Sequence, residues 1–433
     1  MLDDTLLDDP AALQRADHDH ALLALAGVGA RVRTALRLAD AAGLAALRPE
    51  GRPRGVLVAG HGSALTAGEM LAAVAGTACL VTVLPPSDAG PVAREDRRLR
   101  APAFTAGLSW QLPGWAGPLD LLVIATADGD ERGLIGLAEQ GYARGCAIAV
   151  IAPAGSGLAE AALQVRALPL PFVPPALPDQ EDPDGRAGAT GRGVAEPDLP
   201  AEDPGALWAF LAPLLALAEK TGVTQLPSGS LPATADRLDE SAVRCRPDAA
   251  AYINPAKGLA ARLAGTVPLL WAEGPLAAAA ANRFAALLAD RAGRPALAGS
   301  LPQVLLAHRG MFVGQFGAGA DPDDFFRDRI DEPDPLLLQV LLLRHTPGRS
   351  GPDGSDGGAE GRGEDSGGPY EQPADDDAPR GLAVSRAHRL AAAHEVRLTE
   401  FASGRQDRLH ALADLVALTD FAAVYLGLAA EAG

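Results

Sequence analysis

The strongest constraint on the fold is an alternation of short, continuous apolar runs with longer amphipathic stretches. Four apolar runs occur in the first half of the chain, and helical patterns follow the first, third and fourth of them. Strands that are apolar at every position are typical of sheets buried on both faces. Strands that alternate with helices imply a parallel sheet covered on both sides. These expected strands are 55–60, 79–84, 121–126 and 147–152.

The same alternation returns in the second half. Strands are expected at 267–271 and 338–343, with a helix at 276–292 between them. The sequence therefore predicts an α/β protein of two similar halves, each with its own parallel sheet flanked by helices. Further helices are expected over 11–47 (one or two), 207–218, 385–401 and 406–430.

Two low-complexity segments interrupt this pattern, at 174–204 and 348–380. Both are rich in Gly, Pro and Asp and poor in bulky apolar residues, so we expect flexible insertions. The expected organisation is N-terminal helices over 1–47, a first domain at 48–173, the insertion at 174–204, a connecting helix at 205–225, a second domain at 226–347, the insertion at 348–380 and C-terminal helices over 381–433.

Charge and composition exclude several classes of protein. The chain has 37 Lys and Arg against 55 Asp and Glu, a net charge of −18, which disfavours nucleic acid as a partner. No signal peptide is recognisable at the start, and no uninterrupted apolar run reaches the roughly 18 residues of a membrane span. Three widely spaced cysteines form neither a metal signature nor a disulfide framework, so we expect free thiols in a cytoplasmic protein.

Two motifs in the second half carry a family resemblance. One is Asn254-Pro-Ala-Lys257, and the other is the helix and turn at 281–295. They resemble the second half of the bacterial and archaeal phosphoglucose/phosphomannose isomerases. The resemblance implies two sugar isomerase (SIS) domains, a homodimer, a sugar or sugar-phosphate ligand, and aldose–ketose isomerisation without cofactor or metal. A C-terminal helix with Asp420, Tyr425 and Leu426 is similar to the last helix of that family.

The turn Gly60-His61-Gly62-Ser63-Ala64 lies between an expected strand and an expected helix. Backbone N–H groups at a helix start can hold an anion or a sugar hydroxyl, although such a turn can also be only a tight connection. It resembles the family's Gly-Met-Gly-Gly-Ser-Ala turn, which implies that Gly62 and Ser63 bind substrate. His61 replaces a family glycine.

The loop that follows the third strand resembles the family's phosphate-binding Ser-Tyr-Ser-Gly-Asn-Thr-Glu loop. The resemblance implies that Thr126 and Gly129 bind substrate, but Asp128 and Glu131 replace hydroxyl residues. A carboxylate beside a bound dianion is strongly unfavourable. Either phosphate is not bound in the family's way, or the ligand is neutral or cationic. The family's phosphate-binding Arg also has no counterpart in 202–208.

Two residues are candidates for catalysis by resemblance. Asp290 occupies the position of the family's catalytic Glu, with one methylene less, and can also be a solvated charge beside Arg291. Leu306 occupies the position of the family's catalytic His. His308 follows two residues later, and it is either the acid that opens the sugar ring, if the loop is shifted, or an ordinary residue without a chemical role.

Three hypotheses follow, and they leave open whether the protein is an enzyme. It is a glucose 6-phosphate or mannose 6-phosphate isomerase with Asp290 and His308 in catalytic roles. Alternatively, it is a non-catalytic or regulatory member of the same fold that binds a sugar or sugar phosphate. The third hypothesis is an interaction protein that uses its acidic insertions as tethers.

Overall fold

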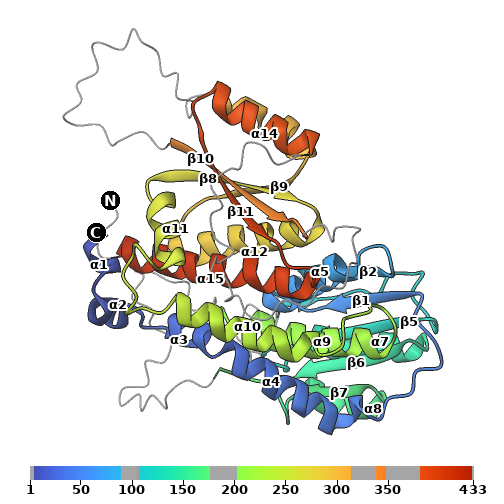
Figure 1. Ribbon diagram of the computed structural model, residues 1–433. Coiled ribbons are helices and arrows are strands. Elements are labelled where there is room, and N and C mark those ends of the chain that lie inside the picture. Colours follow the sequence, from blue (N-terminus) through green and yellow to red (C-terminus); the bar gives the residue numbers. More distant parts are fainter. Residues whose placement is uncertain are drawn as a thin grey trace, which may run out of the picture. The chain divides into compact units, whose positions relative to one another are not determined.

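The computed structural model describes residues 4–88, 105, 107–175, 202–313, 337–347 and 381–431. The expected insertion at 348–380 and most of the one at 174–204 lie outside these ranges. The chain divides into two compact units, one formed by residues 3–254 with 427–433 and the other by 255–426 with the first two residues. Figure 1 shows the helices and strands of the two units, coloured along the sequence.

The first unit is built on a five-stranded parallel sheet with the order β2-β1-β5-β6-β7. Every residue of β1 and β5 is buried, as continuous apolar runs predict. A two-residue antiparallel pair, β3 (Ser87–Asp88) and β4 (Leu108–Ser109), lies apart from this sheet. The five strands are β1 (Gly55–Ala59), β2 (Leu80–Leu84), β5 (Asp120–Ala125), β6 (Ala147–Ala152) and β7 (Leu168–Pro171).

Helices cover both faces of the first sheet. On one face α7 (Arg132–Ala143) and α8 (Gly157–Gln164) share an apolar core with β1, β5 and β6. On the other, α5 (Ser63–Ala75) packs on α9 (Ala206–Lys220), which packs on α4 (Val28–Ala39). The remaining helices of this unit are α1 (Asp4–Leu7), α2 (Pro10–Ala16), α3 (Ala21–Ala26), the π-helical turn η1 (Asp40–Leu44) and α10 (Ser230–Arg244).

The second unit has a four-stranded parallel sheet with the order β11-β10-β8-β9. Its strands are β8 (Thr266–Glu273), β9 (Leu297–Ser300), β10 (Leu337–His345) and β11 (Arg397–Ser403). Helix α12 (Pro275–Ala292) packs on β8, β9 and β10, whereas an apolar core joins the other face to α13 (Gln303–Ala307), η3 (Arg309–Phe312) and α14 (Leu382–Ala393). The unit also contains α11 (Pro255–Leu263) and most of α15 (Arg408–Glu431).

The predicted fold class is confirmed: two parallel sheets, each flanked by helices, with a long helix at the C-terminal end. Arg408–Ala430 is the one segment among the described residues that is long and apolar enough to cross a membrane. It is buried throughout its most apolar window, which is typical of a core helix.

Two sequence predictions about local structure are wrong. The helix expected over 385–401 ends at Ala393, and 397–401 belongs to strand β11. Glu395 has a φ of +54°, which breaks the helix, and the strand then adds to the edge of the sheet. The one or two helices expected over 11–47 are three helices and a π-turn, because the Asp17 carboxylate accepts from Ala21 N at 2.8 Å and Leu22 N at 2.9 Å and starts α3 anew.

Each sheet has one point at which successive connections turn to opposite sides. In the first sheet β2 lies on one side of β1 and β5 on the other. In the second sheet β9 lies on one side of β8 and β10 on the other. Open parallel sheets bind ligands outside the carboxyl ends of their strands at such points. The segments that follow β1 and β5 are therefore the first place to look for a site.

Candidate functional site

The four predicted binding residues of the first unit lie on the two connections that follow β1 and β5. Gly62 and Ser63 belong to the turn that starts α5, and Thr126 and Gly129 belong to the loop between β5 and α7. The two strands are paired in register up to Ala59 and Ile124, so both connections leave the sheet side by side. The turn is further held by a hydrogen bond of 3.1 Å from Trp110 Nε1 to the carbonyl oxygen of Gly60.

Glu131 joins the two connections. Its fully buried carboxylate accepts hydrogen bonds from Thr126 Oγ1, from His61 Nε2 at 2.9 Å and from the backbone N–H of Gly129 at 2.9 Å. Burial by itself would raise the pKa of Glu131, but the hydrogen bonds from His61 and Thr126 outweigh it and the pKa is lowered. Glu131 is therefore an ionised carboxylate held inside the loop.

His61, at a position where the resemblance implies a glycine, is one partner of Glu131. Burial by itself would lower the pKa of His61, but the hydrogen bond to Glu131 and the nearby charges of Glu131, Glu202 and Asp128 raise it. The imidazole is thereby biased toward its protonated form, with Nε2 donating to Glu131. Since the side chain is 28% exposed, this charge lies at the surface of the sheet edge.

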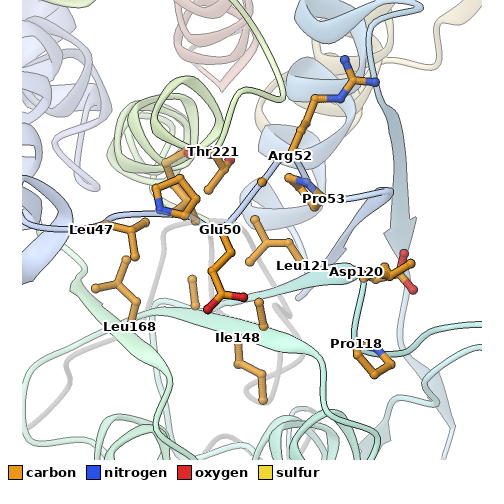
Figure 2. Close-up of a pocket in the computed structure, with 16 residues that line it drawn as sticks. Leu47, Glu50, Arg52, Pro53, Pro118, Asp120, Leu121, Ile148, Leu168 and Thr221 are labelled. Atoms are coloured by element: carbon orange, nitrogen blue, oxygen red, sulfur yellow. Dashed lines mark hydrogen bonds between the residues drawn. The ribbon is translucent and has the colours of Figure 1, made fainter.

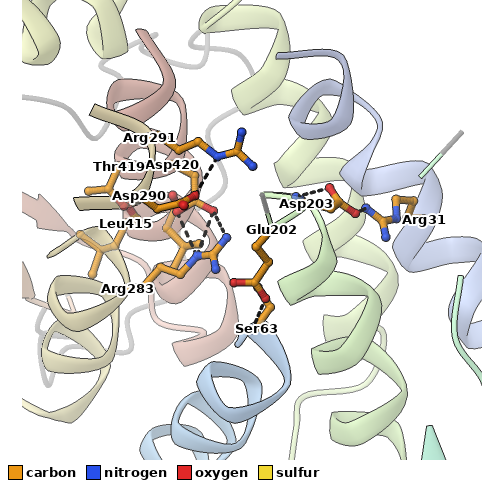
Figure 3. A network of polar contacts seen from close by, with 12 residues as sticks. Arg31, Ser63, Glu202, Asp203, Arg283, Asp290, Arg291, Leu415, Thr419 and Asp420 are labelled. Carbon is orange, nitrogen blue, oxygen red and sulfur yellow. Dashed lines mark hydrogen bonds and ion pairs between the residues drawn. The ribbon is translucent and has the colours of Figure 1, made fainter. Parts of the chain in front are cut away.

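A second carboxylate lies at the start of α5. The backbone N–H of Ser63 donates to Glu202 Oε1, a contact visible in Figure 3. Gly62 has a φ of +54°, and a Cβ at this position would lie 2.5 Å from Glu202 Oε1. Glycine is thus required both by the backbone conformation and by the approach of the carboxylate. Glu202 supplies the negative charge that the positive end of a helix favours.

Glu202 is positioned by its neighbour in the sequence. Asp203 forms an ion pair of 2.6 Å with Arg31 and accepts a hydrogen bond of 2.8 Å from Gly205 N (Figure 3). Arg31, whose side chain is nearly buried, also donates to the carbonyl oxygen of Val173 at 2.8 Å. The segment before α9 is therefore tied to α4, and this anchor holds Glu202 against the start of α5.

Asp128 adds a third carboxylate to this edge. Its Oδ2 atom is buried and accepts no hydrogen bond within the part of the chain that the structure describes. Burial, together with the charges of Glu131 and Asp130, raises the pKa of Asp128. We refer to Asp128, Glu131 and Glu202, with His61, as the carboxylate edge. Across the described residues, no group of three or more His, Cys, Asp or Glu side chains could hold a metal ion.

The predicted catalytic residues of the second unit lie at different ends of its sheet. Helix α12 starts after the carboxyl end of β8 and leads to the amino end of β9, which runs parallel to β8. Asp290, in the last turn of α12, therefore lies toward the amino ends of the strands. His308 follows β9 and α13, at the carboxyl ends. The structure does not bring these two residues to one edge.

Each of these residues also has a structural partner. The Asp290 carboxylate is 46% exposed and forms an ion pair of 3.0 Å with Arg291. His308 Nδ1 accepts a hydrogen bond of 3.1 Å from the indole of Trp271, which is fully buried. Burial lowers the pKa of His308, so the imidazole is biased toward its neutral form.

The motif residues that carry the resemblance contact one another in the core of the second unit. Lys257 is fully buried, with Nζ 5.5 Å from the centroid of the Tyr425 ring. Arg283 forms a buried ion pair of 3.2 Å with Asp420 (Figure 3), and burial raises the pKa of Asp420 to about 6. These matching residues therefore build the scaffold.

The roles of His61, Glu131 and Glu202 were not predicted from the sequence. Their contacts join distant positions, such as Ser63 and Glu202, which are 139 residues apart, so no local pattern could reveal them. A polar network in the second unit was missed altogether. There, Arg344 pairs with Glu273 at 2.7 Å and with Glu400 at 3.0 Å, and His388 donates to Glu400.

A known protein family matches part of the second unit. Residues 253–313 match the family described as the bacterial phospho-glucose isomerase C-terminal SIS domain. The matched stretch contains the Asn254–Lys257 motif, α12, β9 and α13. The resemblance is thus confirmed for this stretch, which is similar to a SIS domain of the phosphosugar-isomerase kind. No curated protein matches the sequence.

Solved structures share the fold at low identity. A hypothetical protein from Thermus thermophilus has 14% identity and a TM-score of 0.52, with 98% of this chain and 89% of that chain covered. The C-terminal domain of a glucosamine-fructose-6-phosphate aminotransferase from Francisella tularensis has 10% identity and a TM-score of 0.48, with 96% and 97% covered. A glucose-6-phosphate isomerase-like protein, also from Thermus thermophilus, has 17% identity and a TM-score of 0.41, with 91% and 88% covered. Only the fold is inferred, and it is inferred from the first of these structures.

Proposed function

We propose that this protein is a phosphosugar-isomerase-like SIS protein that binds a carbohydrate lacking a phosphate group and does not isomerise glucose 6-phosphate or mannose 6-phosphate. One observation carries the proposal: the N–H of Ser63, at the start of α5, donates to the protein's own Glu202 carboxylate. A sugar phosphate bound at this helix start would have to displace Glu202 or lie against it.

The loop after β5 supports the same proposal. The Gly129 N–H and the Thr126 hydroxyl, both expected to bind substrate, donate to Glu131. Asp128 adds another negative charge within the same loop. Repulsion between a phosphate dianion and these carboxylates would be several kcal/mol at an effective dielectric constant of about 20. His61 is the one side chain of the carboxylate edge that can carry a positive charge.

The carboxylate edge suits a neutral or amino sugar instead. Ionised carboxylates accept hydrogen bonds from hydroxyl or ammonium groups, and a His61 imidazole can donate to a sugar oxygen. Gly62, Ser63, Thr126 and Gly129 then act mainly as the framework that orients Glu131 and Glu202. We propose these four residues as binding-site residues in that sense.

The second candidate is a working isomerase with Asp290 as base and His308 as ring-opening acid. The family match favours it, because the matched stretch contains both residues. Their location at opposite ends of the second sheet, and the partners that each already has, support the binding protein instead. A base and an acid for one sugar must both lie within hydrogen-bond reach of it.

The experiment is a coupled assay of purified protein with glucose 6-phosphate and mannose 6-phosphate, with fructose 6-phosphate as product. We expect no turnover above that of a heat-inactivated sample. Turnover by the wild type that is lost in both Asp290→Ala and Asp290→Asn would establish the isomerase and overturn the proposal. Since Asp290 is half exposed, neither variant should impair folding.

We also propose that the protein is a homodimer in the cytoplasm. A homodimer is expected from the family resemblance, and light scattering coupled to size-exclusion chromatography tests it. A cytoplasmic location is consistent with three free cysteines, all of them buried. Secretion of the protein with its thiols oxidised would contradict that location.

A further inference from the structure

The first unit contains a cavity at the end of its sheet opposite to the carboxylate edge. It has a volume of about 530 Å³ and lies at the amino ends of β5, β6 and β7, beside the loop that leads into β1 and the last turn of α9 (Figure 2). This volume is within the range of roughly 300–1,000 Å³ for small-molecule sites. Neither the proposed function nor the family match involves this end of the sheet.

The floor of the cavity is apolar and buried. Leu121, Ile148 and Leu217 line it with at most 8% of their surfaces exposed. The rim is also apolar in part, because Leu119 lines the cavity and is 67% exposed. Covering these surfaces with an apolar ligand would be favourable by about 25 cal/mol per Å².

One carboxylate of the lining, on an exposed residue, has no protein partner. The Glu50 carboxylate extends over the floor, between Leu168 and Ile148 in Figure 2, and has no hydrogen-bond or ion-pair partner among the residues that the structure describes. Arg52 lies on the same loop, but its guanidinium points away from the Glu50 carboxylate (Figure 2). No side chain of the lining therefore pairs directly with Glu50.

Of the other polar side chains of the lining, Asp120 and Thr221 already have partners, whereas Arg52 is exposed and its guanidinium is directed away from Glu50 (Figure 2). Asp120 accepts from Arg54 Nε at 3.0 Å and Nη2 at 2.5 Å and from Gly117 N at 2.9 Å. The Thr221 hydroxyl donates to the carbonyl oxygen of Leu217 at 2.8 Å. Glu50 is thus the group that distinguishes among ligands of similar shape.

We propose that this cavity is a second ligand site, which takes a small apolar molecule bearing one positively charged amine. The apolar body covers the floor formed by Leu121, Ile148 and Leu217, and the ammonium group donates to Glu50. Because this site and the carboxylate edge lie at opposite ends of the strands, an experiment can disprove ligand binding at one of them without bearing on the other.

Three probes of nearly the same shape test the charge requirement. Cyclohexylmethylamine, cyclohexylmethanol and cyclohexanecarboxylate are titrated into the full-length protein at pH 7, and binding is followed by ligand-observed NMR. We expect the amine to bind about fivefold more tightly than the alcohol, which is the upper range for a partly exposed ion pair. The carboxylate should bind most weakly.

Three variants test the location. Glu50→Gln should reduce the affinity for the amine about fivefold, to that for the alcohol, and leave the alcohol unchanged. Ala147→Phe, at an exposed position that lines the cavity, should weaken all three probes. Glu139→Gln, an exposed carboxylate on α7, is the matched control and should change nothing. Absence of saturable amine binding, equal affinity for the three probes, or a preference for the amine that survives Glu50→Gln would overturn the proposal.

Discussion

His61 Nε2 lies 2.9 Å from Glu131 Oε1, and this contact joins the turn after β1 to the loop after β5. By the resemblance of the two segments to the isomerase family, these positions would hold a glycine and a hydroxyl residue. In this protein they hold an imidazole and a carboxylate that bind each other. The two connections at the carboxyl end of the first sheet are therefore held together by a contact between two side chains of this protein.

The His61–Glu131 pair should make stability depend on pH. Because the pKa of His61 is raised above 6.5 in the folded state, its contribution is full below pH 6.5 and is lost as the pH rises through the folded pKa. Because the pKa of Glu131 is lowered below 4.5, its contribution is present above pH 4.5 and is lost as the pH falls through the folded pKa. Stabilisation by the pair is thus greatest between about pH 4.5 and 6.5.

Urea denaturation between pH 6 and 8.5 checks this expectation. The free energy of unfolding of the wild type should exceed that of His61→Gln by about 1 kcal/mol at pH 6, and the difference should shrink toward pH 8.5. Parallel curves for the two proteins would show that the protonation of His61 is not coupled to folding.

Gly62 and Glu202 should be coupled in their effects on stability. Gly62→Ala introduces a Cβ at a φ of +54° and within 2.5 Å of the Glu202 carboxylate. We expect a cost of about 2–3 kcal/mol, of which about 1 kcal/mol is the backbone conformation alone. In a Glu202→Ala background the same substitution should cost only the backbone part. Equal costs in both backgrounds, measured by chemical denaturation, would mean that Glu202 does not lie against Gly62.

The buried Arg283–Asp420 ion pair offers a test of the scaffold in the second unit. Removal of one partner leaves the other charge buried, so Arg283→Met or Asp420→Leu alone should cost about 3–5 kcal/mol. The double variant should be more stable than either single variant, because it leaves no uncompensated charge. A thermodynamic cycle from urea denaturation checks the sign of the coupling. Additive losses would contradict the ion pair.

Sequence patterns predicted the central strands of both sheets, because each of these strands depends on a few neighbouring residues, but they missed the edge strands β7, β9 and β11. The buried runs of β1 and β5 and the long helix α12 are local signals that tertiary contacts reinforce. Strand β11 was missed because it is an edge strand with a charged residue, Glu400, in its middle, and because the helical pattern of α14 continues toward it.

The site was harder to predict, for a physical reason. The residues that match the family, such as Lys257 and Tyr425, contact each other in the core, so they report on the scaffold. The chemistry depends on contacts between distant segments, such as Ser63 with Glu202, and no spacing rule connects these. Resemblance also directed attention to Asp290 and His308, which the topology of the second sheet separates.

Binding of sugar phosphates measured against Glu202 tests the central claim most directly. Glucose and glucose 6-phosphate are titrated into the wild type and into Glu202→Ala, with Glu139→Gln as the matched control, and thermal stabilisation is recorded. We expect no stabilisation of the wild type or the control by glucose 6-phosphate, and a gain in Glu202→Ala, because removing the carboxylate frees the N–H of Ser63 for an anion. The contradicting result is saturable stabilisation of the wild type by glucose 6-phosphate that is as large as the stabilisation of Glu202→Ala. It would show that the protein's own carboxylate does not exclude phosphate from this site.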